Sequence, residues 1–127
     1  MERLVELLRE YPEVEVVITS SWTDAYPLKH IKDLFPPDVA SRILGKTVRE
    51  LSNDDHSRYR EILVYLRSVP GSVPWVALDD DPLNYPKQAP VVLVNPEQGI
   101  DVGCVESLRL HFEKARAARS QVPKARQ

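Results

Sequence analysis

The chain has almost no cysteine, no long apolar run and no large excess of either charge, and each of these absences excludes a class of protein. Cys104 is the single cysteine among 127 residues, so a secreted scaffold held by internal disulfides is excluded. The apolar runs are far shorter than the ~20 residues that a membrane helix needs. The formal net charge of -2 gives no overall attraction to nucleic acid or anionic membranes. We therefore expect a one-domain cytoplasmic protein without a membrane partner.

Several familiar catalytic patterns are missing as well. The sequence contains no glycine-rich phosphate loop, no zinc-ligand spacing and no Ser-His-Asp arrangement. His30, His56 and His111 fall on different predicted elements, so we expect them to have surface or packing roles. Cys104 lies near the start of a predicted helix, where the pKa of a thiol can fall, but the sequence offers it no partner. We expect this side chain to pack in the core.

The sequence does contain apolar helices that alternate with short strands rich in β-branched residues. Helical spacing of apolar residues predicts helices over 2–11, 56–68 and 101–115. Capping residues predict two more, one from Thr23 and Asp24 to about Leu34, and one from Asp38 to Gly45. Short apolar runs, the first of them rich in β-branched residues, predict strands over 14–19, 75–78 and 91–94. This order favours an α/β fold in which helices pack on a parallel sheet.

The last residues are basic and contain few apolar side chains. We expect one domain over residues 1–112 and a disordered tail over 113–127, because such a composition buries little apolar surface. Contact between this tail and RNA is the alternative interpretation of its arginines and lysines.

Function in parallel α/β sheets is usually found at the carboxyl ends of the strands, and three acids follow the predicted strand over 75–78. Asp79, Asp80 and Asp81 repel one another unless a cation, a helix N-terminus or water compensates their charge. Oxygen ligands of this kind suit Mg²⁺, which takes one or two carboxylates together with water and substrate phosphate. The alternative is an acidic loop that is simply solvated.

Two further groups could contact a phosphoryl group. Thr19 and Ser20 lie at a strand end beside free backbone N–H groups, an arrangement that can hold a phosphate oxygen. Ordinary capping of the next helix is the alternative. Arg58, with Arg60 close by, could neutralise a transferring phosphoryl group. A solvated helix face, or an ion pair between Arg58 and Glu61, is the alternative for these arginines.

Four segments, in this order, are similar to the motifs of a known superfamily. They read VEVVITSSW, RYREILVYL, WVALDDD and VVLVNPEQGI, and the similarity around them extends over about residues 5–110. Together they resemble the haloacid dehalogenase-like (HAD) superfamily, and within it the capless group whose domain also occurs in multidomain RNA-repair proteins. The resemblance implies a parallel three-layer α/β/α fold of Rossmann type and Mg²⁺-dependent hydrolysis of phosphate esters.

The resemblance also implies a role for each matching side chain. Thr19, with Ser20 as the near alternative, matches the hydroxyl that holds a phosphoryl oxygen. Arg58, with Arg60 as the second choice, matches the base that neutralises the phosphoryl group. Asp79 and Asp80 match the acids that help to hold Mg²⁺.

One motif of the family has no counterpart in the sequence. The family opens with a strand that ends in Asp-x-Asp-Gly, whose first aspartate attacks phosphorus, and no Asp-x-Asp occurs between Met1 and Trp22. Without this nucleophile the aspartyl-phosphate route is closed, and Mg²⁺ binding should be weak or lost. We therefore expect a truncated phosphohydrolase domain with impaired or absent activity. The alternative is a non-catalytic phosphate-binding, nucleotide-binding or regulatory module that retains the fold.

The missing motif also affects the expected sheet. In the family its strand is central, between the strands that correspond to 14–19 and 75–78, so its loss leaves two edges with unpaired backbone groups. Each such group costs ~1–3 kcal/mol when it is buried. Three outcomes stay open: the two strands pair directly, another chain supplies the strand in an oligomer, or the natural protein is longer. A site without a cap would admit large phosphorylated substrates, with nucleic-acid ends among the candidates.

Overall fold

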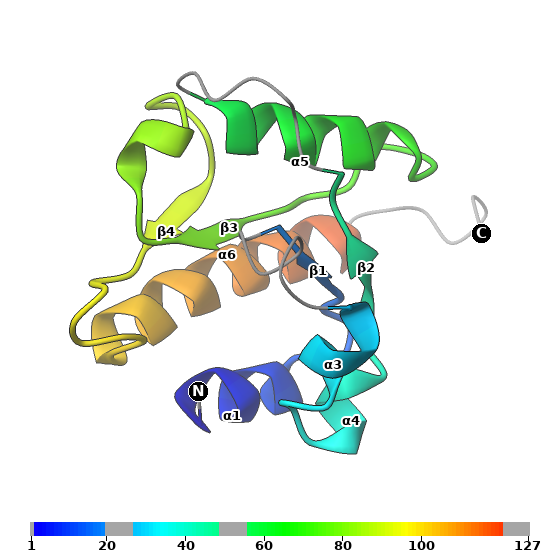
Figure 1. Cartoon of the computed structure of the whole chain (residues 1–127), viewed down its shortest axis with the longest axis vertical. Helices are drawn as coiled ribbons and strands as arrows, with labels where there is room; N and C mark the ends of the chain where they lie inside the picture. The colour runs from blue at the N-terminus through cyan, green and yellow to red at the C-terminus, as the bar shows by residue number, and fades with distance from the viewer. Residues whose placement is uncertain (1, 20–26, 49–55, 121–127) are drawn as a thin grey trace.

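The protein folds as helices packed around two small parallel sheets (Figure 1). The computed structural model describes residues 2–19, 27–48 and 56–120. In chain order the elements are α1 Glu2–Glu10, β1 Val16–Ile18, α3 Leu28–Lys32, α4 Pro37–Ala40, β2 Ile43–Lys46, α5 Ser57–Arg67, β3 Ala77–Asp79, the 3-10 helix η1 Pro82–Asn84, β4 Val91–Leu93 and α6 Val102–Ser120.

Strand pairing is parallel in both sheets, as the sequence predicts. β1 pairs with β2, and β3 pairs with β4 in the register Ala77↔Val91, Leu78↔Val92 and Asp79↔Leu93. Within the described residues the two pairs are separate sheets of two strands each. Parallel pairing aligns the carboxyl ends of β3 and β4, so the residues that follow these strands share one edge.

The predicted helix from Asp38 to Gly45 is wrong in its second half. Helix α4 begins after Pro36 and ends at Ala40, and the residues that follow form strand β2. Ile43 is 1% exposed and is aligned with Val16 of β1. The sequence suggests a helix end because Gly45 is a common left-handed terminal residue, but burial of Ile43 and pairing with β1 decide the conformation instead.

The expected disordered tail over 113–127 is also wrong for its first part, because α6 continues to Ser120. Arg116 explains the difference: its Nε donates to Glu13 at 2.7 Å, and its guanidinium lies 4.5 Å from the centroid of the Tyr11 ring. Arg116 of this segment therefore has an acidic and an aromatic partner near the start of the chain. Residues 121–127, and with them Lys124 and Arg126, lie outside the described residues.

The other predicted helices and strands agree with the structure apart from their bounds. Helix α5 and the predicted helix 56–68 nearly coincide, and β1, β3 and β4 are shorter than predicted or shifted by one or two residues. Helix α3 follows Pro27, whereas the predicted caps Thr23 and Asp24 lie outside the described residues.

The main core lies where the two ends of the chain meet. Helices α1 and α6 pack against each other and contribute most of its buried side chains, among them Leu7 and Leu108. Side chains of both sheets pack on this core, with Val16 from β1 and Leu78 from β3. A second, smaller cluster lies under α5 and contains Ile62, Ala77 and Tyr85. Figure 1 shows α5 and α6 on opposite sides of β3 and β4, so alternate residues of β3 face different helices.

Candidate functional site at the carboxyl end of β3

Asp79 is the last residue of β3, and its carboxylate is directed by the alternation of the strand. Ala77 lies two residues earlier and packs in the cluster under α5, so Asp79 faces the same helix. The Asp79 side chain is 14% exposed. A carboxylate that is this well covered requires hydrogen-bond donors or a cation nearby.

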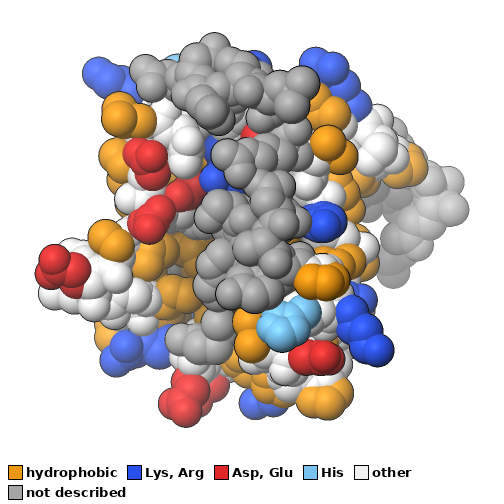
Figure 2. Space-filling model, viewed as in Figure 1, with side chains coloured by type: hydrophobic (Ala, Val, Ile, Leu, Met, Phe, Trp, Pro, Cys, Tyr) orange, Lys and Arg blue, Asp and Glu red, His pale blue; other side chains and the backbone are white. Residues whose placement is uncertain are grey.

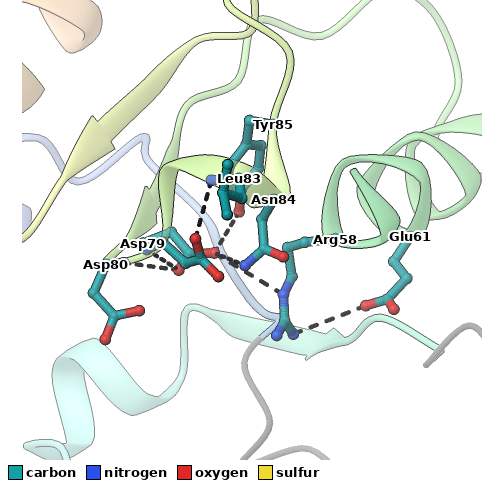
Figure 3. A network of polar contacts seen from close by, with 8 residues as sticks. Arg58, Glu61, Asp79, Asp80, Leu83, Asn84 and Tyr85 are labelled. Atoms are coloured by element: carbon teal, nitrogen blue, oxygen red, sulfur yellow. Dashed lines mark hydrogen bonds and ion pairs between the residues drawn. The ribbon is translucent and has the colours of Figure 1, made fainter. Parts of the chain in front are cut away.

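Four donors from the segment that follows β3 surround this carboxylate (Figure 3). The backbone N–H groups of Asp80 and Asp81 donate to Oδ1 at 2.7 and 3.1 Å. The Tyr85 hydroxyl donates to Oδ2 at 2.9 Å, and Asn84 Nδ2 donates to the same oxygen at 3.4 Å. The loop after β3 is therefore folded back onto the side chain at the end of the strand.

Arg58 supplies the positive charge of the site from the first turn of α5. Its Nε lies 4.0 Å from Asp79 Oδ2, and its Nη1 lies 3.8 Å from Glu61 Oε1. The Arg58 side chain is 22% exposed, yet its Nε is buried and has no hydrogen-bond partner among the described residues. These contacts are long for ion pairs, so the guanidinium is attracted by two carboxylates without being tightly bound to either.

The surroundings of Tyr85 reflect the same charges. Its ring is 7% exposed and packs in the cluster under α5. Burial, followed by the negative charge of Asp79 and the hydrogen bond to it, raises the pKa of the Tyr85 phenol above its usual value. The hydroxyl therefore stays protonated and acts as a donor.

The structure brings the side chains of Arg58 and Asp79 together. Arg60, Asp80 and Asp81, the other predicted candidates, direct their side chains elsewhere. Arg60 is two positions further along α5, and residues so spaced do not share a helix face. The Asp80 side chain is exposed and points away from the network in Figure 3. The Asp81 side chain accepts the N–H of Leu83 at 3.0 Å and so caps η1.

The predicted hydroxyl pair is described only in part. Thr19 directly follows β1 and is half-buried, and Ser20 lies outside the described residues. No hydrogen bond joins Thr19 to Arg58 or Asp79 in the described part of the chain. The expected phosphoryl-binding role of Thr19 and Ser20 stays a prediction.

The implied Mg²⁺ does not fit the described residues as they stand. Over residues 2–19, 27–48 and 56–120, no cluster of three or more His, Cys, Asp or Glu side chains is placed to hold a metal ion. Both oxygens of Asp79 already accept hydrogen bonds, and a guanidinium lies beside them. Asp80 alone is an exposed carboxylate in solvent. A complete magnesium site would need further ligands and a rearrangement around Asp79.

Sequence reasoning missed Asn84, Tyr85 and the burial of Glu61. Asn84 and Tyr85 fall in a proline-rich loop, where no periodic pattern indicates which side chain turns inward. Glu61 is 7% exposed, although an acid on a helix usually faces solvent. The available signal is the i, i+3 spacing of Arg58 and Glu61, which indicates that the two side chains lie on one face of the helix.

On the face in Figure 2, basic, acidic and apolar side chains are interspersed over the described residues. No helix in that part of the chain combines the length and apolar character needed to cross a membrane.

The parallel strand pairs and the arginine–aspartate contact at a strand end are those expected of a HAD-like domain. The family model described as "HAD domain in Swiss Army Knife RNA repair proteins" matches residues 1–103, and the chain belongs to this family. It is thus a HAD domain, of the phosphohydrolase type. No curated protein and no solved structure was found to match the chain.

Proposed function

We propose that this HAD domain binds the phosphoryl group of a phosphorylated substrate beside Arg58, and that the 127-residue chain hydrolyses phosphate esters only slowly. The observation that carries the proposal is the placement of Arg58 Nε 4.0 Å from Asp79 at the end of β3, where it is buried and no group in the described part of the chain accepts a hydrogen bond from it. A guanidinium held in this way can donate to a phosphate oxygen, and its planar set of donors matches that geometry.

The charges of the site indicate that phosphate binds weakly and that catalysis is poor. Arg58 faces Asp79 and Glu61, so the three groups together carry one net negative charge. A phosphate dianion meets repulsion there unless a cation accompanies it. Mg²⁺, the usual cation of the family, finds the exposed carboxylate of Asp80 here but not a free Asp79, and we propose that it binds weakly. No carboxylate of the described residues near Arg58 is left free of hydrogen bonds or ion pairs to act as a nucleophile.

A paired substitution tests the phosphoryl-binding role of Arg58. Binding of inorganic phosphate and of the phosphate analogue tungstate would be measured by calorimetry for the unmodified chain, for Arg58→Ala and for Arg60→Ala. We expect Arg58→Ala to weaken binding about tenfold or more, because a charge-assisted hydrogen bond contributes roughly 1.5–3 kcal/mol. Arg60→Ala, from the other face of α5, is the matched control and should bind as the unmodified chain does. Equal loss in both variants would contradict the assignment.

Turnover separates the proposed function from its alternatives. Hydrolysis of an aryl phosphate with Mg²⁺ by the 127-residue chain should be barely above the uncatalysed rate. Rapid hydrolysis that Asp79→Ala abolishes would show a complete enzyme. Phosphate or nucleotide binding without any turnover would identify the non-catalytic binding module that is the alternative function.

We also propose that a further strand completes the sheet between β1 and β3. In β1, the backbone groups of Val16 and Ile18 bond toward β2, so those of Val17 face the opposite side. In β3, the backbone groups of Ala77 and Asp79 bond toward β4, so those of Leu78 face the opposite side. Both pairs also pack on one core. If another chain supplies the strand, native mass spectrometry should detect an oligomer whose share increases with protein concentration. A monomer at every concentration would contradict supply by another copy.

A further inference from the structure

We infer that Tyr85 and Asn84 withhold Asp79 from metal ions, so that Asp79 holds the loop after β3 beside Arg58 and is not a metal ligand. The inference deepens the proposed function, since it assigns the residues around the same guanidinium. It depends on how the acceptor sites of one carboxylate are used.

An ionised carboxylate offers about four lone-pair sites. Asp79 receives four donors: two backbone N–H groups on Oδ1, and the Tyr85 hydroxyl and Asn84 amide on Oδ2. A metal ion could therefore bind Asp79 only after displacing at least one of them. Because a divalent ion at Oδ2 would also approach the guanidinium of Arg58, 4.0 Å away, charge repulsion acts against the same step.

The donors are fixed by the fold and are not free to leave. Asp81 caps η1 by accepting the N–H of Leu83 at 3.0 Å, and η1 packs against α5. This short helix returns the chain toward β3, so that Tyr85 enters the cluster that contains Ile62 and Ala77. The Tyr85 hydroxyl thus reaches Asp79 from a ring that is 7% exposed. Displacing it requires movement of a packed side chain as well as loss of a hydrogen bond.

Manganese binding tests the inference without phosphate or turnover. Mn²⁺ replaces Mg²⁺ in oxygen sites and is followed by electron paramagnetic resonance, which reports the free ion. We expect the unmodified chain to bind Mn²⁺ only weakly, and Tyr85→Phe to bind it about tenfold more tightly, because one donor to a charged group no longer has to be displaced. The gain should vanish in the double variant Tyr85→Phe/Asp79→Asn.

Two further variants separate this effect from a general loosening of the loop. Tyr59→Phe removes a hydroxyl from a ring that packs against the same cluster, and it should leave Mn²⁺ affinity unchanged. Asn84→Ala removes the longer bond to Oδ2, at 3.4 Å, and should give a smaller gain than Tyr85→Phe. Circular dichroism of each variant establishes that the fold is retained, and Asn84→Ala serves if Tyr85→Phe does not fold.

Two results would overturn the inference. One is sub-millimolar binding of Mn²⁺ by the unmodified chain that Asp79→Asn abolishes, since Asp79 would then be a ligand despite its four donors. The other is an unchanged affinity in the folded Tyr85→Phe and Asn84→Ala variants. Because no phosphate is present, a failure of Arg58 to bind phosphate would refute the proposed function and leave this measurement unaffected.

Discussion

At the scale of single residues, the Arg42 guanidinium binds three backbone carbonyls that are far from it in the sequence. Its Nη1 donates to the carbonyl of Leu8 at 2.6 Å, and its Nη2 donates to those of Tyr11 and Val14, each at 2.7 Å. Its Nε also donates to Val14, at 2.9 Å. These carbonyls belong to the end of α1 and the turn that leads into β1, where helical partners are missing. Arg42 therefore fixes the path between α1 and β1.

Replacement of Arg42 should destabilise the protein more than its partial exposure suggests. Arg42→Ala leaves the three carbonyls without this donor, and we expect a loss of roughly 2–4 kcal/mol in the free energy of unfolding. Arg42→Lys should recover less than half of this, since one ammonium group cannot reproduce the fork of the guanidinium. Urea unfolding followed by circular dichroism measures both losses. A lysine variant as stable as the unmodified chain would contradict this account.

The residues of the site show what a sequence can and cannot indicate at this scale. Helical spacing placed Arg58 on α5 correctly, and a short apolar run placed Asp79 at a strand end, so their meeting at the edge of a parallel sheet could be predicted. The donors Asn84 and Tyr85 could not, because an irregular loop has no period from which an inward side chain can be deduced.

At the scale of elements, the contact between α1 and α6 combines an apolar stripe with a polar border. The stripe of α1 was predicted from Leu7 and its neighbours because helical periodicity is a local property. The polar border could not be predicted in this way. Arg109 binds Glu10, Arg116 binds Glu13, and each pair joins residues about a hundred positions apart. A local pattern therefore predicts a disordered tail at the end of α6, because the partners of that segment lie near the start of the chain.

The pair of Glu13 and Arg116 should make stability depend on acid pH. The hydrogen bond from Arg116 lowers the pKa of Glu13 from 4.5 to about 2. A carboxyl group whose pKa is lowered by folding stabilises the protein above its unfolded value of 4.5, and this contribution is lost as the pH falls toward 2. The contribution should be below about 1 kcal/mol, because the pair is partly exposed and screened by salt.

Thermal unfolding between pH 5 and pH 2 measures this contribution. The melting temperature of Glu13→Gln should fall less steeply over this range than that of the unmodified chain. Glu106→Gln is the control, since Glu106 is an exposed carboxylate of α6 with no ion pair among the described residues. If Glu13→Gln and the unmodified chain lose stability in parallel as the pH falls, the pair contributes nothing.

At the scale of the whole molecule, the two core clusters differ in size and in what they hold together. The larger joins α1, α6 and both sheets, and thus the two ends of the chain. The smaller has Ile62, Ala77 and Tyr85 as its buried members and holds α5 and the loop after β3. Since α5 has few other neighbours, Arg58 is carried by the part of the fold with less buried apolar surface.

Hydrogen exchange should therefore reveal two levels of stability. The amides of α5 should exchange faster than the central amides of α1 and α6, because the smaller cluster can open while the main core stays folded. Ile62→Ala should accelerate exchange in α5 with little effect on α1. Leu7→Ala, which truncates a side chain that is 1% exposed, should accelerate exchange throughout and cost about 2–5 kcal/mol. Equal protection of α1, α5 and α6 in the unmodified chain would mean that the domain opens only as one unit, and that Arg58 is held as firmly as the core.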